Sequence, residues 1–224
     1  MEGGRVQSCH FCEQSEPAYN PSRLVDTPLT QTDSFVSWAS LGALVEGWVL
    51  ALPRRHHLNL GELGSDEVRN FEEFCADLSR SVSSVYKSPV YEFEHGATFR
   101  GSAVGCSIDH AHLHLVPVSL DLRRLAVERA PSLLWESVDS VAEARMKCAP
   151  GESYLYLREP GGQRYAAHGK NIPSQFFRQL IAQELDLGEP FWRRDSRLTT
   201  SNNTVLRLLE ATGRAHSGFV SLGT

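Results

Sequence analysis

The chain has 224 residues, a length that suits one domain with or without a substantial extension. Its 22 basic and 27 acidic residues give a formal net charge of −5, which argues against non-specific binding to a nucleic-acid polymer. No apolar run reaches the roughly 20 residues of a membrane span, and residues 1–14 lack the apolar core of a secretory signal. The five cysteines, an odd number, favour free or metal-bound thiols over a disulfide framework. We therefore expect a cytoplasmic protein with no membrane partner.

The first 120 residues predict a compact α+β unit that begins with an irregular segment, residues 1–32. Alternation over 34–39 predicts a strand, and the apolar run 44–52, closed by Pro53, predicts its antiparallel partner. Residues 65–87 predict a helix capped by Ser65, because apolar side chains recur there every three or four positions. Residues 90–94 predict a short strand, followed by a tight turn around residues 93–96.

The rest of the chain predicts further elements of both kinds. We expect a strand at 107–118, a helix at 131–147, a hairpin of 153–158 and 163–167, and helices at 174–187 and 203–211. The predicted fold class is α+β: an antiparallel sheet of about five strands with the 65–87 helix packed across it. Residues 1–120 would form one domain, and residues 121–224 a C-terminal α+β extension packed on it.

A histidine stands at every second position of His110-Ala111-His112-Leu113-His114-Leu115-Val116. Because alternate side chains of a strand share a face, the three imidazoles would point one way and the apolar residues between them into a core. Histidine near neutral pH can bind metal, move protons or attack phosphorus. Gly105 and Ser107 can offer backbone N–H groups and a hydroxyl to a phosphate, which favours chemistry at phosphorus over a metal centre on the triplet.

This segment matches the histidine-triad (HIT) signature, His-φ-His-φ-His-φ-φ, where φ is an apolar residue. The Gly105-Cys106-Ser107 lead-in, two residues before His110-Ala111-His112, resembles the related hexose-1-phosphate uridylyltransferases. Those relatives carry Gln where this chain has His114, which favours the HIT hydrolases over sugar-nucleotide exchange. Residues 44–56 resemble the family's strand that ends in Pro, two basic residues and His. The resemblance covers about residues 9–120, and it implies that residues 1–120 form a HIT-like nucleotide-binding catalytic domain.

The resemblance implies a nucleotide hydrolase or nucleotidyltransferase that cleaves a nucleoside phosphate conjugate at the α-phosphate. His112 would be the nucleophile that forms a covalent nucleotidyl-histidine, and its other ring N–H should donate to a nearby carbonyl. His114 would contact the phosphate or assist the leaving group, and His110 would position the phosphate or bind a structural metal. Further candidates for contacts with the nucleotide phosphates are Ser107, His95, Gly105, Arg100 and Gln175, the last opening a helix together with Arg178. Candidate walls of the base pocket are Phe35, Trp38 and Trp48.

The pair Cys9 and Cys12 supplies two thiolates at the spacing of a zinc knuckle. The resemblance implies that His56 and His110 complete a Cys₂His₂ site, with His57 as a rival for the third position. A closed site with four protein ligands is structural, so we expect a structural zinc and no catalytic metal.

Three alternatives stay open. The nucleotidyl group could pass to an acceptor other than water, such as phosphate, sulfate or a sugar phosphate, if residues 121–224 exclude water. A non-catalytic module would bind a nucleotide and form no covalent adduct. A zinc hydrolase would hold its metal on His110, His112 and His114.

The resemblance also implies a homodimer through the sheet and helix, and leaves open whether the extension covers that surface.

Overall fold

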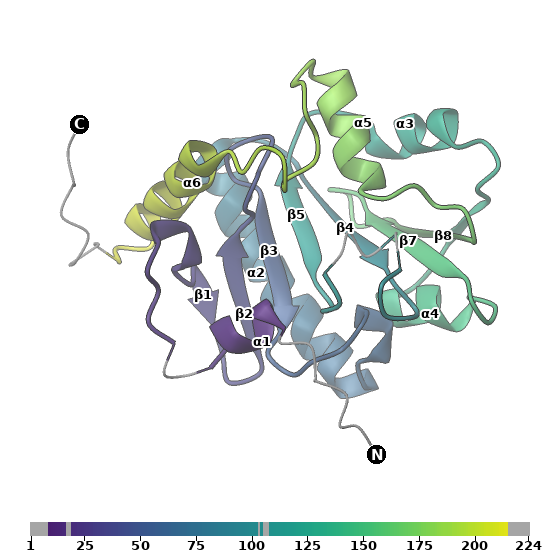
Figure 1. Cartoon of the computed structure of the whole chain (residues 1–224), viewed down its shortest axis with the longest axis horizontal. Helices are drawn as coiled ribbons and strands as arrows, with labels where there is room; N and C mark the ends of the chain where they lie inside the picture. Colours follow the sequence, from purple (N-terminus) through teal and green to yellow (C-terminus); the bar gives the residue numbers. More distant parts are fainter. Residues whose placement is uncertain (1–8, 17–18, 103, 105–107, 215–224) are drawn as a thin grey trace.

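The computed structural model describes residues 9–16, 19–102, 104 and 108–214 (Figure 1). Within these residues the strands form one antiparallel sheet of eight strands, in the order β1-β2-β3-β5-β4-β7-β8-β6. The strands are β1 Thr30–Gln31, β2 Phe35–Ala39, β3 Val49–Pro53, β4 Val90–Gly96, β5 Leu113–Pro117, β6 Trp135–Ser137, β7 Ser153–Arg158 and β8 Arg164–Gly169. The α+β class is confirmed. The expected strand number of about five is wrong, because β7 pairs with β4 and extends the same sheet into residues 121–224.

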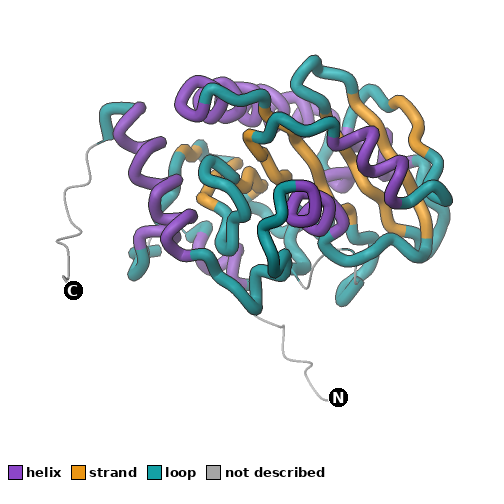
Figure 2. Tube along the Cα trace, turned by 90° about the horizontal axis from the view of Figure 1, so that it is seen from above, coloured by secondary structure: helices purple, strands orange, loops and turns teal. Residues whose placement is uncertain are grey.

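Helices lie on both sides of this sheet (Figure 2). They are α1 His10–Gln14, α2 Ser65–Tyr86, α3 Leu122–Arg129, α4 Val141–Met146, α5 Phe176–Glu184 and α6 Leu198–Ala211, with 3₁₀ turns η1 Leu24–Asp26 and η2 Leu60–Glu62. The longest, α2, is capped by Gly64 rather than by Ser65: the Glu67 carboxylate accepts the backbone N–H of Gly64 at 3.0 Å. In the described part of the chain, no helix is long and apolar enough to cross a membrane.

The two faces of β5 meet different cores, as the alternation of its sequence predicts. Leu113 and Leu115 pack with Phe71 and other apolar residues of α2, together with Ala111 just before the strand. On the opposite face, α5 contributes Phe177 to a second core that also holds Phe93 of β4. Burial of each large apolar side chain stabilises the fold by about 1.5–3 kcal/mol. Strand β5 is therefore held between α2, which covers its apolar face, and α5, which lies on the side of its histidine face.

The predicted strand 107–118 is shorter in the structure, where β5 begins at Leu113. The last registered pair between β3 and β5 is Ala51 with Leu113, and β3 ends at Pro53, which has no N–H for a ladder. The Ala111 N–H instead donates to the carbonyl of His57 at 2.7 Å. His110 and His112 therefore lie in an extended loop at the strand entry, and only His114 lies in the strand.

The predicted helix over 131–147 is wrong in its first half. Residues 135–137 form the edge strand β6, which pairs with β8, and α4 begins only after Ser140, whose hydroxyl accepts the N–H of Glu143 at 3.2 Å. Helix α3, capped by Asp121, was not expected. The hairpin of 153–158 and 163–167 is confirmed as β7 and β8. A domain boundary near residue 120 stays a prediction, and the sheet is continuous across it.

Candidate active site

A cleft of about 740 Å³, open to solvent, lies on the sheet face opposite α2. It is lined by α1, the segment 23–26, β2, β3, the entry to β5, α5 and the loop before α6. The lining residues are His10, Phe11, Gln14, Arg23, Val25, Asp26, Trp38, Ala39, Ser40, Leu41, Leu50, Ile108, His112, His114, Arg178 and Trp192. Two of the three histidines of the motif thus meet in one cleft.

His112 is fixed by a hydrogen bond to the backbone of the motif itself. Its Nδ1 lies 2.7 Å from the carbonyl oxygen of His110. Because a carbonyl only accepts, Nδ1 carries the proton and Nε2 keeps a lone pair. Burial lowers the pKa of His112, which favours the neutral ring. This arrangement is the carbonyl contact expected of a nucleophilic histidine.

His114 has the opposite tautomer. The indole Nε1–H of Trp48 donates to His114 Nδ1 at 3.0 Å, and an indole N–H is a donor only. The proton of a neutral His114 therefore lies on Nε2. Burial, with the nearby charges of His112, His95 and Arg178, lowers the pKa of His114 well below its usual value. The ring centroids of His112 and His114 lie 4.9 Å apart, so the two imidazoles are neighbours in the cleft.

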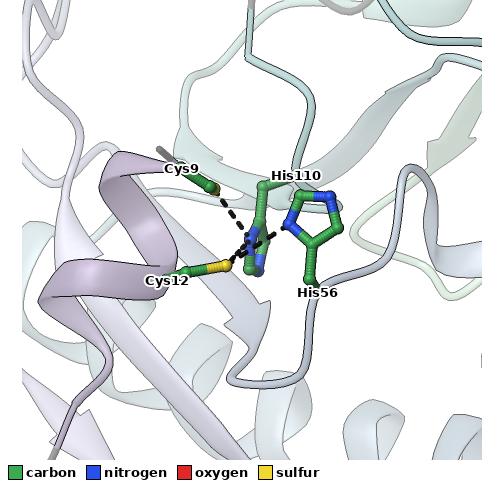
Figure 3. Close-up of side chains that lie close together, drawn as sticks. All are labelled: Cys9, Cys12, His56 and His110. Carbon is green, nitrogen blue, oxygen red and sulfur yellow. Dashed lines mark hydrogen bonds between the residues drawn. The ribbon is translucent and has the colours of Figure 1, made fainter. Parts of the chain in front are cut away.

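His110 is not among the residues that line the cleft, and its ring lies beside Cys9, Cys12 and His56 (Figure 3). Its Nδ1 lies 3.4 Å from Cys9 Sγ and 3.5 Å from Cys12 Sγ, and His56 Nδ1 lies 3.3 Å from Cys12 Sγ. Ligand atoms around a tetrahedral zinc stand about 3.5 Å apart for a sulfur–nitrogen pair, from the usual bond lengths. Among the described residues, these four are the one group of close metal-binding side chains.

One histidine of this group of four also makes the second hydrogen bond that orients a metal-binding imidazole. His110 Nε2 lies 2.8 Å from the carbonyl oxygen of Pro53, which fixes Nδ1 as the ligand atom. His57, the rival for the third position, lies outside the group, with its Nδ1 3.7 Å from Glu62. A set of two thiolates and two imidazoles suits zinc. Since His110 turns to the thiols, the three histidines of the motif do not converge on one metal.

The remaining candidates for contacts with the phosphates do not lie together in the structure. His95 lies inside β4 rather than in a turn: β4 runs on to Gly96 because each of its last residues pairs with β7. It stands beside His114, with ring centroids 5.8 Å apart, and its Nε2 accepts the N–H of Phe177 at 3.3 Å. Burial lowers the pKa of His95 to about 3. Arg100 is exposed and Gln175 is buried just before α5, and neither lines the cleft. Gly105 and Ser107 lie outside the described residues.

The expected walls of a base pocket are partly corrected. Trp38 lines the cleft, next to Leu50. Phe35 packs against α2 on the other face, and Trp48 is fully buried and bonds to His114. Sequence reasoning missed the segment 23–26, where the Asp26 carboxylate accepts hydrogen bonds from Arg23 and Gln14. No periodicity marks that segment, so only the folded chain reveals it as a wall.

No family model matches the sequence, and no curated protein matches it. Several solved structures are similar. A HIT family protein from Bacillus anthracis is 14% identical with a TM-score of 0.42, over 56% of this chain and 97% of that one. A HIT family member from Bacillus subtilis is 16% identical with a TM-score of 0.41, over 57% and 99%. A hypothetical histidine triad nucleotide-binding protein from Sulfolobus tokodaii is 19% identical with a TM-score of 0.40, over 49% and 68%. These proteins bear the family name that the motif predicts.

Proposed function

We propose that this chain is a HIT-type nucleotide hydrolase or nucleotidyltransferase, which cleaves a nucleoside phosphate conjugate at the α-phosphorus through a covalent nucleotidyl-His112. The observation that carries this proposal is the hydrogen bond between His112 Nδ1 and the His110 carbonyl. It leaves the lone pair of Nε2 available on a buried ring that lines the cleft.

The reaction is a double displacement. The Nε2 lone pair of His112 forms a bond to the α-phosphorus, and the bond from phosphorus to the leaving group breaks, with its electron pair going to the leaving atom. The imidazolium that results keeps its Nδ1 proton, and the His110 carbonyl stabilises it. The oxygen of water or of another acceptor then attacks phosphorus and loses its proton to solvent, and the N–P electron pair returns to Nε2.

In this proposal His114 binds the phosphate and does not transfer a proton. Because Trp48 holds Nδ1, the Nε2–H of the neutral ring is a hydrogen-bond donor that can stabilise charge on a non-bridging oxygen as it develops. The aromatic ring of Trp38 and the side chain of Leu50 offer the apolar wall that a nucleobase requires.

We also propose that Cys9, Cys12, His56 and His110 hold a structural zinc ion. The donor set and its spacing fit the ion, and the His110 Nε2 contact orients one ligand. The zinc would hold α1 against the entry of β5. Phe11 of α1 lies beside His112 there, with ring centroids 5.9 Å apart. The zinc would thereby shape the cleft wall, while the chemistry at phosphorus stays with His112.

Turnover by variants tests the proposed function. We would assay a panel of dinucleoside polyphosphates, nucleotide sugars, adenylylsulfate and nucleoside phosphoramidates, with water alone and with added phosphate or sulfate as acceptor. His112→Ala should lower turnover by at least about a thousandfold, since loss of a nucleophile has effects of this size. The control His168→Ala, on β8 and outside the cleft, should keep wild-type turnover. Binding of nucleotides without turnover by the wild type would contradict the proposal and favour a binding module.

A further inference from the structure

Helix α1 belongs at the same time to the proposed zinc site and to the wall of the cleft. Cys9 directly precedes the helix and Cys12 lies within it, and both are in the group of metal-binding side chains. His10, Phe11 and Gln14 of the same helix line the cleft. A helix of five residues is too short to be stable by itself in water, so its place depends on the contacts of its side chains.

Phe11 makes contacts with both sites. It stands between the two thiols in the sequence and is 8% exposed. Its ring centroid lies 5.7 Å from that of His110 and 5.9 Å from that of His112, and both contacts are edge to face. On the cleft wall it stacks on Trp38, with centroids 5.9 Å apart and an angle of 5° between the planes. Aromatic pairs at such distances are favourable beyond the area they bury. A displacement of Phe11 would therefore change the surroundings of a proposed zinc ligand, of the proposed nucleophile and of the cleft wall together.

His110 provides a second connection between the two sites. Its Nδ1 lies 3.4 Å from Cys9 Sγ and 3.5 Å from Cys12 Sγ. Its carbonyl oxygen accepts the Nδ1–H of His112 at 2.7 Å. The side chain of this residue thus belongs to the proposed zinc site, while its backbone fixes the ring of His112. A shift of the side chain on metal binding would move the carbonyl with it.

Two further hydrogen bonds hold the other end of α1. The Gln14 side chain donates to the Asp26 carboxylate at 3.1 Å, and Arg54 donates to the carbonyl of Ser15, just after the helix. Both bonds lie at the C-terminal end of α1, away from the first turn, which carries Phe11. Loss of the metal would therefore loosen the turn that carries Phe11, while the end of the helix stays attached.

We infer that Phe11 is a positioning residue that couples the zinc site to the cleft, so that zinc and a nucleotide each strengthen the binding of the other. This inference rests on the proposed function, since it needs zinc on the four ligands and a nucleotide in the cleft. Coupling between two sites is reciprocal: the factor by which zinc raises the affinity for the nucleotide equals the factor by which the nucleotide raises the affinity for zinc. The zinc affinity therefore reports on the coupling without any turnover.

The test measures zinc affinity by competition with a chromophoric chelator, with and without a saturating nucleoside monophosphate. The probe is the tightest binder among the adenosine, guanosine, cytidine and uridine monophosphates. The nucleotide should strengthen zinc binding by the wild type at least about fivefold, the lower end of typical couplings. Phe11→Ala keeps all four ligands and should show a shift of less than about twofold. Phe99→Ala, which removes a half-exposed phenylalanine outside the cleft, is the matched control and should respond as the wild type does.

Equal zinc affinity of the wild type with and without the nucleotide would overturn the coupling, and an undiminished shift in Phe11→Ala would overturn the role of Phe11. Chelation of zinc by the free nucleotide is the same for every protein, so the difference between variants does not contain it. If Phe11→Ala does not fold, Phe11→Leu, which keeps an apolar side chain without the ring, takes its place. A wild type that binds zinc but none of the four nucleotides would contradict the proposed function and the inference with it. A wild type that binds a nucleotide but no zinc would overturn the inference and leave the proposed reaction standing.

Discussion

At the scale of single residues, the site is defined by which nitrogen of each histidine carries the proton. The spacing of the motif predicts that the three imidazoles share one face, and the nucleophile role that the resemblance implies for His112 predicts its hydrogen bond to a carbonyl. Neither predicts that Trp48 holds His114, because the hydrogen bond joins residues 66 positions apart in the chain. That His110 lies with Cys9, Cys12 and His56 follows from the resemblance and not from the spacing. Local pattern gives the residue types of the site, and the tautomers follow only from tertiary contacts.

The bond between Trp48 and His114 is open to a direct test. Trp48→Phe removes the N–H that selects the tautomer, so His114 loses part of its ability to donate from Nε2. We expect kcat to fall by about 2- to 10-fold, which corresponds to one neutral hydrogen bond. Trp135→Phe, on the edge strand β6 and outside the cleft, is the control and should keep wild-type kcat. Unchanged kcat in Trp48→Phe would show that the tautomer of His114 is immaterial.

A second residue-scale prediction concerns the buried carboxyl of Glu94, on the α2 side of the sheet. Its oxygens accept from the Leu60 N–H at 2.7 Å and the Tyr154 hydroxyl at 2.6 Å. Burial, with a smaller contribution from the charge of Glu62, raises the pKa of Glu94 to about 8. The native state therefore holds a proton that the unfolded chain releases near pH 4.5, so this group makes the free energy of unfolding fall between about pH 4.5 and 8.

The measurement is denaturant unfolding of the wild type and Glu94→Gln at pH 5.5 and pH 8.5. The Gln variant does not titrate, so its free energy of unfolding should fall less than that of the wild type between these values. The difference between the two proteins should be on the order of a few kcal/mol. Parallel pH dependence in both proteins would contradict the raised pKa of Glu94. Each protein is compared at the same zinc concentration.

At the scale of elements, the strands and helices with clear periodicity are where the sequence places them. Helix α2 and the hairpin of β7 and β8 are examples. The predictions of secondary structure are wrong where pairing with a distant strand overrides the local sequence pattern. Residues 135–137 follow a helical pattern with their neighbours but pair with β8, and β5 is cut short where Pro53 ends its partner. Helix α1 is five residues long, and a helix of that length is too short to be stable by itself in water.

The proposed zinc site gives the element-scale prediction. Wild-type protein should bind about one zinc ion per chain, and His56→Ala should bind it at least about tenfold more weakly. His57→Ala is the matched control, because the adjacent histidine lies outside the ligand group, and it should bind zinc as the wild type does. Metal analysis after dialysis and competition with a chromophoric chelator measure both. Loss of zinc from His57→Ala but not from His56→Ala would contradict the ligand set.

At the scale of the whole molecule, the C-terminal half continues the sheet of the first half (Figure 1). The sequence shows a hairpin at 153–167 but cannot show that β7 pairs with β4, some 60 residues earlier, because strand pairing at that separation leaves no local pattern. Arg178 reaches the histidines from α5 by the same arrangement. The two halves therefore build one sheet and one cleft.

This continuity predicts cooperative unfolding. Amide protection of β4 and β5 should be lost at the same denaturant concentration as that of β7 and β8, because the pairing of β4 with β7 couples them. Hydrogen exchange at increasing urea measures both pairs in one sample. Loss of protection in β7 and β8 at clearly lower urea than in β4 and β5 would show that the extension is a separate unit.

The most direct test of the central claim is the intact mass of the protein, quenched within milliseconds of mixing with its substrate. We predict a gain of one nucleoside monophosphate on the wild type and no gain on His112→Ala. Peptide analysis should place the adduct on His112, and its acid lability and base stability should match a phosphoramidate. Turnover of substrate with no adduct at any quench time, or the same adduct on His112→Ala, would contradict covalent catalysis by His112.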